Sequence, residues 1–179
     1  MAQESARPWV LKLNECPEGT RYFEFEADAG ELDLSAESFS FPGPLRVGLT
    51  VVRTLETFHL EGEIECPVEG ACCRCLESAK ENVEASMRLL LQCKAASEEE
   101  LEALAEEEIE ILRPGTDTFD MREALREEIL LELPMQIHCQ HDCKGLCPQC
   151  GQNLNVGSCS CKEEESDPRW AALGELKFS

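Results

Sequence analysis

Four segments in the first half of the chain alternate apolar and polar residues with a period of two, which predicts β-strands with one buried face. They cover residues 22–27, 45–55, 58–66 and 83–91. A short connection at 54–57 joins the second and third segments, so we expect these two to form an antiparallel pair. The residues predicted to face the core are Phe23, Phe25, Ala27, Leu45, Val47, Leu49, Val51, Phe58, Leu60, Gly62, Ile64, Cys66, Val83, Ala85, Met87, Leu89 and Leu91.

The hydrophobic period changes toward that of a helix in the second half of the chain. A helix is predicted over 121–132, because Asp120 and Glu123 have the spacing of a capping box, an apolar stripe follows and Pro134 ends the segment. The run Ser166-Asp-Pro168 predicts a last short helix, with the aspartate as its cap and the proline at its first position.

An acidic stretch, residues 97–110, lies between the strands and the first of these helices. Ser97 and Glu100 also have the spacing of a capping box, and Leu101 and Leu104 follow at helical spacing. The stretch is therefore interpreted as a solvated helix or as a flexible acidic insertion.

Together these elements predict an α+β protein with a mainly antiparallel β body, a few helices and a C-terminal zinc-knuckle segment. Residues 1–135 are assigned to the body, which begins with a candidate edge strand at 9–13. Residues 136–179 are assigned to a cysteine-rich tail with its short helix. Because 179 residues is the usual size of one domain, body and tail are expected to be integrated in one domain.

The chain is strongly acidic, with 37 acidic against 16 basic residues and a net charge of -21. Proteins that bind nucleic acid without sequence preference neutralise phosphates with Lys and Arg, so this composition opposes such binding. The same charge favours association with basic partners, of which ribosomal proteins are one class.

The cysteines number twelve and are expected to be reduced or bound to metal rather than paired in disulfides. The first residues, MAQESARPWVLKL, do not resemble a signal peptide, and no apolar run has the length of a membrane helix. We therefore expect a cytoplasmic protein that does not enter a membrane.

The densest cysteine pattern is Cys147-Pro-Gln-Cys150-Gly151, followed by Cys159 and Cys161. Two residues between the first two cysteines let both sulfur atoms converge on one zinc ion about 2.3 Å away, and the glycine can adopt the left-handed conformation of such a turn. Cys159 and Cys161 would complete a tetrahedral site. Disulfides and a redox-active CxxC pair are the alternatives; the second also lacks the surrounding βαβ pattern.

A second CxxC, formed by Cys72 and Cys75, lies between two predicted strands, and Cys139 and Cys143 remain without an assignment. These four would make a second zinc site that ties the body to the tail. A single zinc ion shared differently and a free cysteine pair remain as alternatives.

The other sulfur and imidazole groups are interpreted as non-ligands. The cysteines outside the two sets, interpreted as isolated and partly buried thiols, are Cys16, Cys66, Cys73 and Cys93. His138 and His141 are interpreted as polar surface residues, although each is able to replace a cysteine ligand.

Nothing in the sequence points to catalysis. It contains no evident arrangement of a nucleophile with its base and no glycine-rich phosphate loop, and a site of four cysteines leaves no open position on the metal. We therefore expect a protein that is not an enzyme and has no small-molecule substrate.

Three blocks of the sequence resemble the YceD family. They are Cys72-Cys-Arg-Cys-Leu-Glu77; Glu128-Ile-Leu-Leu-Glu-Leu-Pro134; and a tail of Cys143-Lys-Gly-Leu-Cys-Pro-Gln-Cys-Gly-Gln-Asn-Leu-Asn155, Cys159-Ser-Cys161 and Asp167-Pro-Arg-Trp-Ala-Ala-Leu173. The blocks occur in the family's order across about residues 45 to 176. The chain departs from the pattern by the extra cysteine, Cys73, and by the acidic insertion after Cys93.

The resemblance implies a bacterial factor that supports accumulation of 23S rRNA and assembly of the large ribosomal subunit, with structural zinc. Its implied partners are large-subunit components, either a basic ribosomal protein or the 23S rRNA precursor. A zinc-ribbon adaptor that binds a basic partner in transcription or translation is the alternative. If RNA or a partner is contacted near the metal sites, the candidate residues are Arg74, Lys80, Lys144, Lys162 and Arg169.

Overall fold

Strands dominate the structure, a computed structural model that describes residues 7–95 and 109–161. Its helical elements in these ranges are one α-helix and one short 3-10 helix. In chain order the elements are β1 (Val10–Lys12), η1 (Leu13–Glu15), β2 (Gly19–Ala27), β3 (Phe39–Ser40), β4 (Leu45–Thr54), β5 (Thr57–Ala71), β6 (Ser78–Cys93), β7 (Ile109–Leu112), β8 (Thr118–Asp120) and α2 (Arg122–Leu131). The few helices of the α+β prediction thus correspond to α2 and η1 in the described residues, and the short helix predicted from Ser166 lies outside them.

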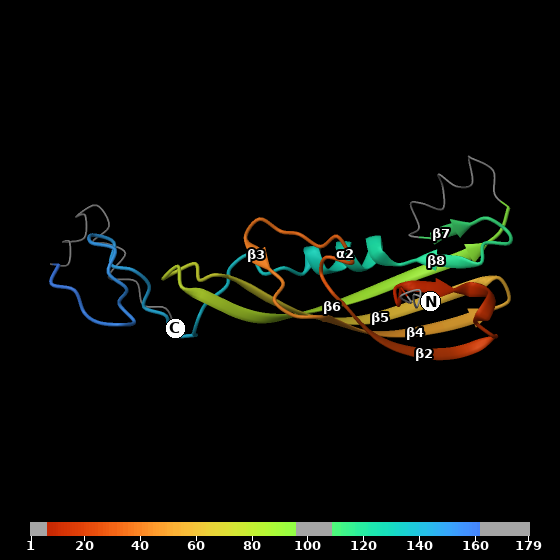
Figure 1. Cartoon of the computed structure of the whole chain (residues 1–179), viewed down its shortest axis with the longest axis horizontal. Coiled ribbons are helices and arrows are strands. Elements are labelled where there is room, and N and C mark those ends of the chain that lie inside the picture. The colour runs from red at the N-terminus through yellow and green to blue at the C-terminus, as the bar shows by residue number, and fades with distance from the viewer. Residues whose placement is uncertain (1–6, 96–108, 162–179) are drawn as a thin grey trace, which may run out of the picture.

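The main sheet has the strand order β2-β4-β5-β6-β7, and β3 pairs with β5 on a separate path. β4 and β5 form the expected antiparallel hairpin, with Thr54 opposite Thr57 at its turn. β5 and β6 are paired over fifteen positions, from Thr57 opposite Gln92 to Ala71 opposite Ser78. This second hairpin extends well beyond the other strands, as Figure 1 shows.

The strand at 9–13 is confirmed, but it belongs to a second, two-stranded sheet in which β1 pairs with β8. β7 differs from the sequence prediction, which assigns the acidic stretch 97–110 to a solvated helix or a flexible insertion. The structure instead places Ile109–Leu112 parallel to the end of β6. The four residues IEIL alternate too briefly to be recognised as a strand beside a long glutamate run. Residues 96–108 lie outside the described part of the chain.

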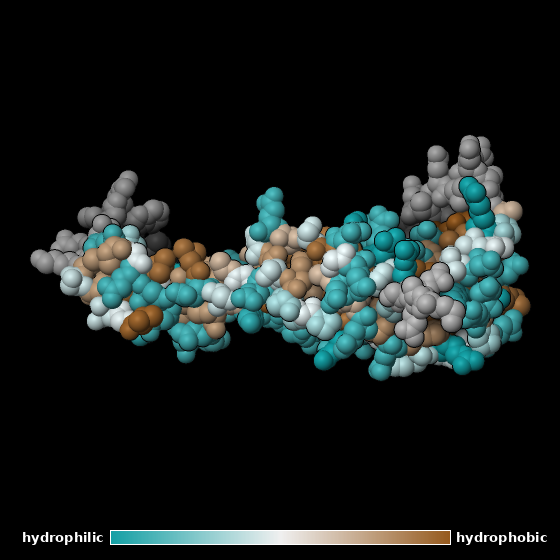
Figure 2. Space-filling view, in the orientation of Figure 1, coloured by the Kyte–Doolittle hydropathy of each residue, from teal (hydrophilic) through white to brown (hydrophobic). Residues whose placement is uncertain are grey.

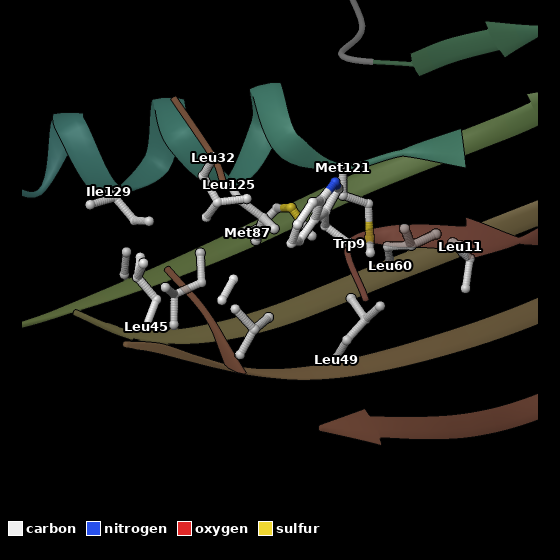
Figure 3. Close-up of a cluster of buried hydrophobic side chains, with 14 of the residues drawn as sticks. Trp9, Leu11, Leu32, Leu45, Leu49, Leu60, Met87, Met121, Leu125 and Ile129 are labelled. Carbon is white, nitrogen blue, oxygen red and sulfur yellow. The ribbon is translucent and has the colours of Figure 1, made fainter. Parts of the chain in front are cut away.

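One face of the main sheet forms the core, and α2 lies across it on β5 and β6. In Figure 3, Leu125 and Ile129 of this helix point toward Leu45 and Met87 of the sheet. Every residue of β4, β5 and β6 that was predicted to face the core is buried, apart from Leu89, which is only partly buried. Val68 and Ala79, which lie on the same strands outside the predicted segments, are buried as well. The alternation therefore identified the inner face of the three central strands.

β2 is the exception to this agreement. Its expected inward residues, Phe23 and Phe25, are exposed to 38% and half-buried respectively, and only Ala27 is buried. The strand lies at the edge of the sheet, whereas α2 packs mainly on β5 and β6, so the inner face of β2 lacks a full cover. Alternation reports which residues share a face, but not whether a second layer covers that face.

The helix expected over 121–132 is observed as α2, one residue shorter at each end. Met121 rather than Asp120 occupies the N-cap position. The carboxylate of Asp120 still accepts a hydrogen bond from the backbone N–H of Arg122 at 3.0 Å and forms an ion pair with its guanidinium at 2.7 Å. None of the helices in the described ranges is long and apolar enough to span a membrane.

After α2 the chain runs along the sheet to the tip of the β5–β6 hairpin, where the tail forms a separate small lobe (Figure 1). In the space-filling view a narrow region connects this lobe to the body (Figure 2). Backbone hydrogen bonds fix the arrangement, since Cys73 N–H donates to Ile137 O at 2.9 Å and Leu146 N–H donates to Arg74 O at 3.1 Å. The hairpin tip is therefore the point where body and tail meet.

The packing of α2 predicts a large difference between two leucines of the same helix. Leu125 is fully buried, so Leu125→Ala should lower the free energy of unfolding by about 2–5 kcal/mol through lost burial and a residual cavity. Leu131 is 79% exposed, and Leu131→Ala should change it by less than about 0.5 kcal/mol. Urea denaturation of both variants measures the two values. Equal losses would contradict the assignment of the buried face.

Candidate metal centres

Four cysteines from two distant parts of the chain meet at the tip of the β5–β6 hairpin. They are Cys72, Cys75, Cys139 and Cys143, called the hairpin cluster below, and their sulfur atoms all lie within 4.8 Å of one another. The Cys72–Cys143 and Cys75–Cys139 sulfur pairs are 3.8 and 3.5 Å apart. Thiolates at tetrahedral corners around one zinc ion would be about 3.8 Å apart, since each Zn–S bond is about 2.3 Å. The cluster thus has the dimensions of a metal site, and the sulfur atoms are too far apart for disulfides.

A second set of four is formed within the tail by Cys147, Cys150, Cys159 and Cys161, called the tail cluster below. Its sulfur atoms also lie within 4.8 Å of one another. The two clusters differ in exposure. Three members of the hairpin cluster are buried, whereas in the tail cluster only Cys147 is buried, Cys150 is exposed and the other two are half-buried. Each cluster can hold a metal ion, but the ion in the tail would be closer to solvent.

The same turn presents the CxxC pair in both clusters. Leu76 N–H donates to Cys72 O, and Gly151 N–H donates to Cys147 O, both at 2.9 Å. The residue after the second cysteine is in the left-handed region in each case, with φ of 62° at Leu76 and 73° at Gly151. Glycine adopts this conformation freely, whereas leucine does so at a cost of about 1–2 kcal/mol. The sequence CRCL therefore forms the same knuckle as CPQCG, under backbone strain.

Residues other than the cysteines connect the two clusters through hydrogen bonds and close packing. The sequence alone did not indicate this role for them. Asn155, in the loop of the tail cluster, donates through Nδ2 to the sulfur of Cys143 at 3.3 Å and accepts the N–H of Lys144 at 2.8 Å. Arg74 donates through Nη1 to Cys143 O at 3.1 Å. Gly145 has a φ of 73°, and a Cβ there would lie 3.0 Å from Arg74 O. The loop after Cys143 therefore packs backbone to backbone against the first knuckle.

The electrostatics of both clusters favour a cation. Hydrogen bonds from the Cys139 backbone lower the pKa of Cys72 to about 5, and those from the Cys150 backbone lower the pKa of Cys147 to about 6. The neighbouring sulfur of Cys75 raises the pKa of Cys139 to about 12, and that of Cys150 does the same for Cys161. In each cluster one cysteine ionises easily, but the repulsion between neighbouring thiolates opposes ionisation of all four. A divalent cation at the centre would offset this repulsion.

Three of the remaining four thiols agree with their interpretation as buried or partly buried groups. Cys16 and Cys66 are buried and Cys93 is half-buried, and burial raises the pKa of Cys66 to about 11. The expectation was wrong for Cys73, which is exposed because it occupies the outer position of the knuckle turn. Its sulfur lies 3.2 Å from Nε2 of His138.

His141 agrees with the expected surface role, because its side chain is fully exposed and contacts the carboxylate of Asp142 at 3.0 Å. Of the predicted contact residues, Arg74 and Lys144 lie beside the clusters, and Lys80 forms an ion pair with Glu69 at 3.6 Å on the sheet. Lys162 and Arg169 lie outside the described residues.

A β-sheet whose longest hairpin carries one tetracysteine cluster, next to a second cluster in a small tail, defines a β protein with two sites that could each hold a metal ion. The family model described as "Large ribosomal RNA subunit accumulation protein YceD" matches residues 60–177, about two thirds of the chain. The chain therefore belongs to the YceD family, as its sequence blocks indicated.

Individual relatives are similar over most of this chain. An uncharacterized protein of Mycobacterium tuberculosis is 33% identical over 132 residues, which cover 74% of this chain and 61% of that protein. The YlbN protein of Bacillus subtilis is 29% identical over 93% of this chain and 94% of its own length. The chloroplastic YCED homolog 1 of Arabidopsis thaliana, named as a large ribosomal RNA subunit accumulation protein, is 28% identical over 75% of this chain and 49% of its length.

The alignments thus span less than two thirds of the mycobacterial and plant relatives. No solved structure matches the chain significantly.

Proposed function

We propose that the protein is a non-enzymatic biogenesis factor that supports accumulation of 23S rRNA during assembly of the large ribosomal subunit. The observation that carries this proposal is the YceD match over residues 60–177, because it includes both cysteine clusters, most of the long β5–β6 hairpin and α2. The names of the plant relatives point to the same process. We propose that the protein acts in the cytoplasm as one integrated domain, with body 1–135 and tail 136–179.

We further propose two structural zinc ions per chain, one in the hairpin cluster and one in the tail cluster. Support comes from the all-cysteine ligand sets, the tetrahedral sulfur spacing and the conflict among the sulfur charges. Soft thiolate ligands in a tetrahedral set favour zinc over harder divalent cations. Four cysteines close the coordination sphere, so each ion would hold chain segments together rather than activate water.

The hairpin cluster would have the larger structural effect. Its ligands Cys75 and Cys139 are 64 residues apart in sequence, so an ion there would close a long loop and fasten the tail to the sheet. The tail cluster, in contrast, would organise a local loop.

The proposed partners are large-subunit components. The net charge of -21 favours a basic ribosomal protein over direct, non-specific contact with the 23S rRNA precursor. Local contact through Arg74, Lys80 or Lys144 remains part of the proposal. The alternative, an adaptor for a basic partner in transcription or translation, uses the same two clusters and the same acidity.

Zinc content should distinguish ligands from neighbouring thiols. Elemental analysis of the purified protein should give two equivalents of zinc, and Cys75→Ser or Cys150→Ser should each leave about one, because each variant disrupts one cluster. Cys73→Ser is the matched control within the same CCRC segment and should retain two equivalents. Less than half an equivalent in the native protein, or zinc loss in the Cys73 variant, would contradict the ligand assignment.

The two ions should leave the protein at different rates. Because the tail cluster is more exposed, a chelator such as EDTA should remove one equivalent quickly and the second at least about tenfold more slowly. A zinc-responsive dye follows both phases. Cys150→Ser should abolish the fast phase and Cys75→Ser the slow one. The reverse assignment, or a single phase in the native protein, would contradict the exposure argument.

In cells depleted of the protein, the ratio of 23S to 16S rRNA should fall, and the native chain should restore it. Cys75→Ser should fail to restore the ratio and Cys73→Ser should succeed, since the first disrupts the attachment of the tail. An unchanged ratio after depletion would reject the proposed process. A pull-down that recovers polymerase subunits without ribosomal proteins or assembly factors would favour the adaptor function.

A further inference from the structure

The outer face of the main sheet is uncovered in the described part of the chain. Side chains that alternate with the core residues of β2, β4, β5 and β6 point away from α2 and are exposed or half-buried. Most of those that carry charge are acidic. The outer face of the sheet, called the acidic face below, presents the carboxylates Glu24, Glu26, Glu61, Glu63, Glu65 and Glu84 and the guanidinium groups Arg46 and Arg88. Nearer the hairpin tip the same face carries Glu69 and Lys80, which form an ion pair with each other.

The strand register concentrates these carboxylates in adjacent rows. One row across the sheet reads Glu26, Arg46, Glu65, Glu84. Arg46 lies 3.2 Å from a carboxylate oxygen of Glu26 and 4.0 Å from one of Glu65. Glu84, however, stands directly opposite Glu65, and like charges in this position destabilise a sheet. The Glu65–Glu84 pair therefore costs stability although Arg46 forms ion pairs in the same row, which suggests that the charge is used for binding.

A groove of about 610 Å³ runs over these rows between β2, β4 and β5. Gly48 lines it, and the hydroxyl of Tyr22 lies so close to this glycine that a Cβ there would come within 2.9 Å of it. The ring of Tyr22 is 63% exposed, and its hydroxyl donates to Glu24 at 2.9 Å. The groove therefore combines the ring of Tyr22 with four carboxylates, and the guanidinium of Arg46, which also lines it, is paired with two of these. The net acidic lining suits the aliphatic stem and cationic head of Lys or Arg.

The groove lies next to a free strand edge. β2 is nine residues long, and within the described ranges its neighbour in the sheet is β4 alone. An edge strand of this length offers unpaired backbone N–H and C=O groups to an extended chain. These features favour an extended polypeptide over a compact cation as the occupant.

We propose that the acidic face binds an extended, Lys- and Arg-rich segment of a partner protein, which lies along β2 with its cations over the carboxylates. RNA does not fit this face, because its phosphates would meet six carboxylates. The inference deepens the proposed function and rests on it for the partner's role in subunit assembly. Its test measures binding and does not use an rRNA readout. A failure of the binding proposal is therefore distinguishable from a failure of the proposed function.

The test uses the full zinc-loaded chain and a fluorescent decapeptide of five Lys-Thr repeats, followed by anisotropy at physiological salt. The triple variant Glu63→Gln, Glu65→Gln, Glu84→Gln should weaken binding at least tenfold. The matched control Glu123→Gln, Glu127→Gln, Glu132→Gln removes three exposed carboxylates from α2 and the turn after it, and should weaken binding less than twofold. Equal weakening in both triples would overturn the proposal, since overall charge would then explain the binding.

Two further measurements locate the peptide and verify the fold. Backbone amide shifts on titration should concentrate in β2, β4 and β5 of the native chain; shifts concentrated in α2 or the tail would overturn the assignment. The acidic-face triple should keep its zinc and melt no lower than the native chain, because it removes the repulsion between Glu65 and Glu84. A labelled oligouridylate of ten nucleotides should leave the β2, β4 and β5 amides unshifted, and shifts there would overturn the choice of a polypeptide partner.

Discussion

The pairing of β5 with β6 is the constraint on which the rest of the structure depends. Its fifteen paired positions correspond to a hairpin of about 50 Å, far longer than a typical strand pair. One end supplies the centre of the sheet and the surface on which α2 packs, and the other end supplies Cys72 and Cys75. The same backbone ladder therefore positions the hydrophobic core and the first metal ligands, and it holds them at opposite ends of the molecule.

The two ends of this hairpin are stabilised by different physics. At the body end, apolar side chains of the sheet, β1 and α2 are removed from water, which requires no cofactor. At the tip the buried cluster consists mainly of cysteines, with Ala79 and Ile137 as its other buried members. With only Phe39 and Leu146 packed against it as further apolar side chains, this cluster offers far less apolar surface than the core of the body. The ions proposed above would therefore contribute more to the order of this lobe than to that of the body.

The sequence predicted the central strands because α2 covers one face and water the other, so alternation has a physical cause there. It predicted the CxxC half of each cluster because this spacing is set by local turn geometry. Cys139 and Cys143 were paired with Cys72 and Cys75 only because they remained without an assignment, so alternatives to this set stayed open. The sequence could not predict the exposure of Phe23 and Phe25, which depends on how far α2 extends, or β7, which is four residues long. The hydrogen bond from Asn155 to the sulfur of Cys143 could not be predicted either, because it joins two loops whose packing is not encoded by any local pattern.

The separation of the hairpin ligands also has a consequence for synthesis. Cys75 leaves the ribosome 64 residues before Cys139, and at about 5–20 residues per second this delay lasts several seconds. During that time the exposed CxxC pair can hold a metal ion only incompletely. Closure of the cluster must wait until the whole of α2 has been made, whereas the tail cluster gathers its ligands from one short stretch. Completion of the hairpin cluster thus marks the moment at which the body of the chain is fully translated.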